Sequence, residues 1–165
     1  MRSSCMLRTN PFANFGVRQL KNSSRRMPDL DIIESKLGAI KKYILILKSN
    51  LPTVSVDSLE MYAMERLFQL IVDAAIDINT HIITRSDLEP PDDYQGTFAI
   101  LADNKILPQE FADTISKSVG LRNLLVHGYE KVDKHKALND ISKGIGQYSE
   151  YMRHIRDFME KQPKS

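Results

Sequence analysis

Three long stretches of this chain carry apolar residues at alternating spacings of three and four, and this pattern constrains the fold more than any other feature. Each stretch places its apolar side chains along one side of an α-helix, and that side must be buried against other helices. The stretches run from about Pro28 to Ser49, from about Ser58 to Ile83 and from about Lys134 to Lys161. Long helices with short connections predict an all-α fold, an antiparallel helical bundle.

Two shorter helices complete the predicted bundle and bring the expected number to about five. One covers about Tyr94–Asp103, and the other begins near Pro108 and ends at a polar motif described below. Asp57 with Glu60 three positions later resembles a capping box at the start of the second long helix. Asp133 is a suitable N-cap for the last helix.

Residues 1–27 differ in composition from the rest of the chain. They contain six basic residues and no acidic one, which leaves 17 basic against 21 acidic residues, a net charge of −4, in residues 28–165. An organellar transit peptide has this composition. The interpretation that we favour is a disordered or non-native extension ahead of a start at Met27, so that residues 28–162 form the domain. A mildly acidic domain argues against a broad basic face for nucleic acid.

The composition also narrows the environment of the chain. Cys5 is its only cysteine, which excludes an internal disulfide or a thiolate metal site and is typical of a reducing cytoplasm. No apolar run approaches the roughly 20 residues that cross a bilayer. We therefore expect a cytoplasmic protein that does not span a membrane.

The polar motif consists of Arg122, Asn123 and His127, followed by Gly128 and Tyr129. Arginine grips phosphate with a planar fork of donors, and histidine transfers protons near neutral pH. Together they can act on a phosphodiester without a metal. Glycine commonly follows a helix end, so we expect the helix to end around His127. Asn123, four positions earlier, could then hydrogen-bond the imidazole. The other interpretation is ordinary capping, because cations are favourable at a helix C-terminus.

The stretch from Arg122 to Asp133 resembles the signature of the HEPN superfamily, an Arg, four residues and a His. More narrowly, it is similar to HepT-like ribonuclease toxins, whose pattern continues to a Tyr two positions after the His. Residues 65–83 and 94–101 resemble further segments of the same family. The resemblance extends over about Met27 to Lys161.

This resemblance implies a HEPN-like homodimer that cleaves RNA with Arg122 and His127 and needs neither a metal nor a cofactor. It also implies a partner, a nucleotidyltransferase antitoxin of the MntA type, which silences the toxin by transferring AMP to Tyr129. The chemistry gives a separate reason to expect two copies. Attack by the 2′-hydroxyl of RNA needs a base, an acid and a stabilised phosphorane, and one motif supplies a single His.

Asp73, Asp77 and His81 follow one another at intervals of four on the second long helix. We predict that Asp77 and His81 support the motif, by orienting His127 or by lining the dimer cleft. The alternative is a solvated stripe on which these two side chains pair with each other. A metal site is disfavoured, because no fourth ligand is evident.

Two other functions remain open from the sequence. The chain could be a non-catalytic nucleotide-binding or adaptor subunit that docks a nucleotidyltransferase, or a helical dimerisation module. HEPN-like domains without the Arg and His suit the adaptor role better, and this chain keeps both residues.

Overall fold

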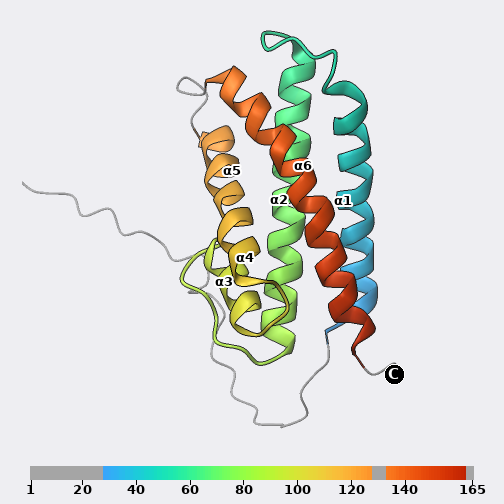
Figure 1. Ribbon diagram of the computed structural model, residues 1–165, viewed down its shortest axis with the longest axis vertical. Helices are drawn as coiled ribbons and strands as arrows, with labels where there is room; N and C mark the ends of the chain where they lie inside the picture. The colour runs from blue at the N-terminus through green and yellow to red at the C-terminus, as the bar shows by residue number, and fades with distance from the viewer. Residues whose placement is uncertain (1–27, 128–132, 163–165) are drawn as a thin grey trace, which may run out of the picture.

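The computed structural model describes residues 28–127 and 133–162, and the predicted extension at residues 1–27 lies outside them. The described residues form six α-helices and no strand (Figure 1). The helices are α1 (Leu30–Asn50), α2 (Leu59–Arg85), α3 (Gly96–Asp103), α4 (Gln109–Ile115), α5 (Lys117–His127) and α6 (Lys134–Glu160). This confirms the predicted all-α bundle.

The predicted fourth helix is divided into α4 and α5 at Ser116, so the described part of the chain has one helix more than expected. The Ser116 hydroxyl donates to the carbonyl of Asp113, and the Ser118 hydroxyl donates to that of Ile115 at 2.6 Å. Hydrogen bonds of this kind compete with the backbone ladder and bend helices. Neither Pro nor Gly marks this position in the sequence, so the break was not predicted.

Side-chain caps begin the long helices. Asp29 accepts two backbone N–H groups at the start of α1, and Asp133 caps α6 as predicted. The predicted cap of α2 was wrong by one residue. Ser58, rather than Asp57, is the N-cap, and its hydroxyl accepts the backbone N–H of Met61.

The central helix of the bundle is α2, which contacts α1, α3, α5 and α6. In Figure 1, α6 crosses diagonally over α2 towards α1. The crossing is close at Gly144, where a Cβ atom added to the glycine would lie 2.5 Å from Cε2 of the buried Phe68 ring. α2 is also long and apolar enough, by composition alone, to cross a bilayer. Its position in the centre of the bundle, with a mostly buried surface, accounts for that composition.

Two buried tyrosines on α6 connect three other helices through hydrogen bonds. Ser118 on α5 donates to a carbonyl, so its oxygen accepts the hydroxyl of Tyr148 at 2.6 Å. Tyr151 donates to Oδ1 of Asn79 on α2 at 2.7 Å, and Asn79 donates to Thr97 on α3 at 3.1 Å. Burial raises the pKa of both tyrosines, so they stay protonated donors.

Candidate active site

Arg122 lies on α5 and is held against α2 by an ion pair. Its Nε donates to Oδ1 of Asp73 at 2.8 Å, and the two side chains are 23% and 36% exposed. One Nη1 hydrogen goes to Oδ1 of Asn123 at 3.1 Å. Asn123 therefore contacts Arg122, whereas the sequence had suggested a contact with the imidazole of His127. The guanidinium is fixed in direction while part of it still faces solvent.

His127 is the last described residue of α5 and is exposed; residues 128–132 lie outside the described residues, so the predicted helix end stays a prediction. Because α5 stays helical between Arg122 and His127, the two residues are about 7.5 Å apart along the axis and rotated by roughly 140°. They point to different sides of one helix. Tyr129, the predicted AMP acceptor, lies in residues 128–132, outside the described residues.

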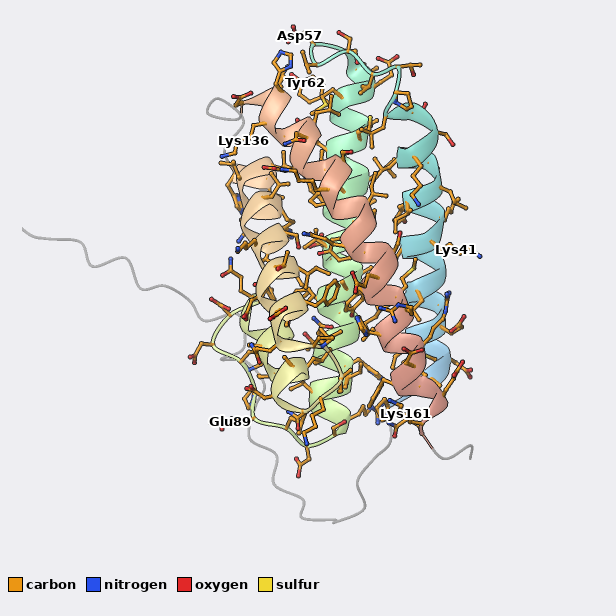
Figure 2. All side chains as sticks on the ribbon, in the orientation of Figure 1. Lys41, Asp57, Tyr62, Glu89, Lys136 and Lys161 are labelled. Carbon is orange, nitrogen blue, oxygen red and sulfur yellow. The ribbon has the colours of Figure 1, made fainter. Side chains whose placement is uncertain are left out.

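Lys134, at the start of α6, contacts two side chains at the start of α2. Its Nζ lies 3.6 Å from Oδ1 of Asp57, donates to the Tyr62 hydroxyl at 3.3 Å and sits 4.8 Å from the centre of that ring. Figure 2 shows Asp57, Tyr62 and Lys136 at the same end of the bundle, where α6 begins. Nearby on α2, burial raises the pKa of Glu65, and the charge of Lys134 opposes that effect. No sequence pattern had indicated this cluster.

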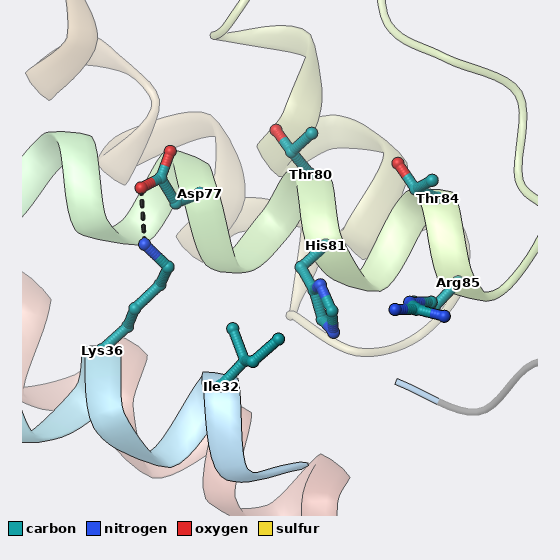
Figure 3. Close-up of a pocket in the computed structure, with 7 residues that line it drawn as sticks. All are labelled: Ile32, Lys36, Asp77, Thr80, His81, Thr84 and Arg85. Carbon is teal, nitrogen blue, oxygen red and sulfur yellow. Dashed lines mark hydrogen bonds and ion pairs between the residues drawn. The ribbon is translucent and has the colours of Figure 1, made fainter. Parts of the chain in front are cut away.

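Asp77 and His81 face α1, and their described hydrogen bonds are to α1 and its N-cap rather than to Arg122 or to each other (Figure 3). Oδ2 of Asp77 accepts from Lys36 at 2.6 Å. Nε2 of His81 accepts the backbone N–H of Asp29 at 2.9 Å. Neither the motif support nor the mutual pairing expected from the sequence is found among the described contacts of these two side chains. Their supporting role therefore stays a prediction, dependent on a second copy of the chain.

A hollow of about 580 Å³ lies beside Asp77 and His81, between α1 and α2. Lys36 and Arg85 line it as well, and sequence reasoning missed both. The spacing of four between His81 and Arg85 is the signal that could have placed Arg85 there. In the described ranges, no three His, Cys, Asp or Glu side chains come together in a way that could hold a metal ion.

Comparisons with known proteins all point to one family. The family model described as Ribonuclease HepT-like matches residues 33–155. The chain is 37% identical over 135 residues to the tRNA nuclease HepT of Aphanizomenon flos-aquae, covering 78% of this chain and 90% of that protein. It is 26% identical over 129 residues to the mRNA nuclease HepT of Shewanella oneidensis, covering 76% and 97%.

Solved structures of similar proteins have the same fold. YutE from Bacillus subtilis, described as a cytosolic protein of unknown function, superimposes with a TM-score of 0.74 at 22% identity, over 85% of this chain and 98% of that one. The tri-AMPylated HEPN toxin of Shewanella oneidensis, solved in complex with its MNT antitoxin, gives a TM-score of 0.65 at 25% identity, over 77% and 98%.

Proposed function

Because this chain belongs to the HepT-like ribonuclease family, we propose that it is a metal-independent RNA endonuclease, the toxin of a toxin–antitoxin pair, with Arg122 and His127 as its catalytic residues. The observation that carries the proposal is the fixed, partly exposed guanidinium of Arg122 on the helix that ends at His127. The proposed domain is residues 28–162, and the proposed location is the cytoplasm. The two HepT relatives are named for different RNA classes, so the proposed substrate is RNA without further restriction.

Arg122 is suited to hold the reacting phosphate. Arginine has five N–H donors, and the described contacts of Arg122 use one for Asp73 and one for Asn123. The remaining three are free for phosphate oxygens. The Asp73 carboxylate fixes the direction of the fork before substrate binds, so little reorganisation is needed as charge develops on the phosphorane.

His127 is suited to transfer the protons. Its imidazole is exposed at the helix end, where a 2′-hydroxyl or a leaving 5′-oxygen can reach it. A single imidazole cannot be base and acid at the same moment in one attack. Two apposed copies of α5 would provide one imidazole for each role, and would let the Arg122 of one copy meet the His127 of the other.

We therefore propose a homodimer whose cleft joins the two motifs. Arg122 and His127 point to different sides of α5, so one copy alone does not direct both side chains at one phosphate. Leu124, between them on the same helix, is 43% exposed and offers an apolar contact for a second copy. Within this arrangement Asp77 and His81 would reach the motif only across the dimer.

The proposed partner is a nucleotidyltransferase antitoxin that attaches AMP to Tyr129. The support is the solved HEPN toxin that is AMPylated and bound to an MNT antitoxin. Tyr129 follows His127 by two residues, so an AMP group there would place phosphate and nucleoside beside the catalytic imidazole. It would block the cleft and repel the RNA backbone.

Induced expression without a partner tests this proposal. Wild-type chain should arrest the growth of a bacterial host and degrade cellular RNA. Arg122→Ala and His127→Ala should do neither, with cleavage by the purified proteins reduced roughly 100-fold or more. Cleavage should persist when a chelator is present. The matched controls are Arg153→Ala and His135→Ala, which remove the same residue types from other positions, on α6.

The opposite result identifies the alternative function. If all five proteins are soluble, unmodified on Tyr129 and equally without effect on RNA, the chain is no nuclease. The non-catalytic adaptor that docks a nucleotidyltransferase would then be the better description.

A further inference from the structure

The hollow between the start of α1 and the end of α2 is separate from the motif. In Figure 3, His81 and Arg85 extend from α2 on the side that faces α1, where Ile32 and Lys36 lie. From Asp73, which holds Arg122, α2 rises by about 18 Å to Arg85. The residues that line the hollow therefore do not form part of the Arg122 and His127 motif within one copy of the chain.

His81 contributes a hydrogen-bond donor to this hollow rather than a charge. Its Nε2 accepts the backbone N–H of Asp29, so this nitrogen carries no proton. The proton of the neutral ring is then on Nδ1. Burial and the neighbouring cations Arg85 and Lys36 lower the pKa of His81, against the opposing charge of Asp29, and keep the ring neutral near pH 7.

Arg85 is the surplus cation of the hollow. Asp77, the carboxylate in the lining, is already paired with Lys36 at 2.6 Å. No carboxylate among the described residues lies within ion-pair distance of Arg85. Thr80 and Thr84 add two hydroxyl groups to the lining. The hollow thus offers one unpaired positive charge and an excess of donors.

We propose that this hollow binds the phosphate group of a nucleotide. The planar fork of Arg85 matches two phosphate oxygens, and the imidazole N–H of His81, on the same side of α2, can serve a third (Figure 3). At about 580 Å³ the hollow has room for more than a bare phosphate. Ile32, 39% exposed, gives an apolar wall for a sugar or base.

Two sources present this same phosphate chemistry. One is a nucleotide within an RNA strand that continues from the active site, several nucleotides from the scissile bond. This source rests on the proposed function. The other is a free nucleotide, whose binding needs no nuclease activity.

Direct binding tests the hollow first. Inorganic phosphate and AMP are titrated into the full chain while the Arg85 Nε–H and His81 ring signals are followed by NMR. We expect saturable shifts in wild type and Arg153→Gln, and an affinity at least about tenfold weaker in Arg85→Gln. Absence of shifts in wild type at millimolar ligand, or unchanged affinity in Arg85→Gln, overturns the proposal.

Steady-state RNA cleavage then distinguishes the two sources. A several-fold higher KM with unchanged kcat in Arg85→Gln identifies the RNA strand. An unchanged KM together with lost AMP binding identifies the free nucleotide. His127→Ala should bind AMP at the hollow as wild type does while cleaving no RNA. Failure of the proposed nuclease activity and failure of this phosphate site are therefore distinguishable.

Discussion

Replacing Gly144 by alanine tests how closely α6 packs on α2. The added Cβ would lie 2.5 Å from Cε2 and 2.9 Å from Cζ of Phe68. Phe68 is 1% exposed, and its ring meets Tyr148 edge-on at 6.2 Å between centroids. The ring has little room to move away, so α6 must shift outward or the core must repack.

A matched substitution on the same helix separates this contact from helix propensity. Alanine is favoured over glycine in a helix interior by roughly 0.8–1.0 kcal/mol. Gly146 is exposed, and a Cβ added there meets nothing within 4 Å, so Gly146→Ala should stabilise the protein by about 1 kcal/mol. Overpacking a core costs about 1–3 kcal/mol, so Gly144→Ala should range from neutral to about 2 kcal/mol destabilising.

Urea unfolding followed by circular dichroism measures both free energies of unfolding. The difference between the two variants, about 1–3 kcal/mol, reports the contact with Phe68, because the propensity contribution cancels. Adding Phe68→Leu to Gly144→Ala removes the ring atoms that the new Cβ would meet. The double variant should therefore recover part of the free energy of unfolding that this overlap costs. Equal stabilisation by Gly144→Ala and Gly146→Ala would refute the reasoning.

Three further predictions concern the site and its supports. Asp73→Asn should lower RNA cleavage by about tenfold, because Arg122 loses the carboxylate that directs it; unchanged kcat/KM would contradict this. Ser118→Ala should cost about 1–3 kcal/mol in urea unfolding, because the buried Tyr148 hydroxyl loses its acceptor. Combining it with Tyr148→Phe should cost less than the two single losses added together, and strict additivity would count against the contact. Finally, the free energy of unfolding should fall as the pH drops from the ordinary pKa of 6.5 through the lowered folded-state pKa of His81, since the unfolded chain takes up the proton first. His81→Gln should flatten this slope, and a slope that stays the same would argue for another group.

Much of the fold could be predicted because the long helices have clear periodicity and caps. The buried stripe of α1 and the cap at Asp133 follow from local sequence. The cap of α2 was misassigned because Asp57 and Ser58 are adjacent and both suitable, and only the backbone geometry decides between them. The break at Ser116 could not be predicted, because it depends on side-chain hydrogen bonds to the backbone and no Pro or Gly lies at that position.

Only those features of the site that depend on residues close together in the sequence could be predicted. The position of Arg122 and His127 on one helix follows from the sequence, whereas the partner of Arg122, Asp73, is 49 residues away. Periodicity shows that Asp73, Asp77 and His81 share one side of α2. It does not show that α5 packs against the first of them and α1 against the other two.

The two tyrosine hydroxyls of α6 determine the register of the helices. Most of the core is isoleucine and leucine, and such surfaces can pack in more than one alignment when a helix slides by a turn. If α6 slid by a turn, the hydroxyls of Tyr148 and Tyr151 and their partners on α5 and α2 would lose their hydrogen bonds. Each buried polar group left unpaired would cost about 1–3 kcal/mol of the free energy of unfolding. Polar matching therefore selects one alignment among those that apolar packing allows, and in that alignment Asp73 lies opposite Arg122.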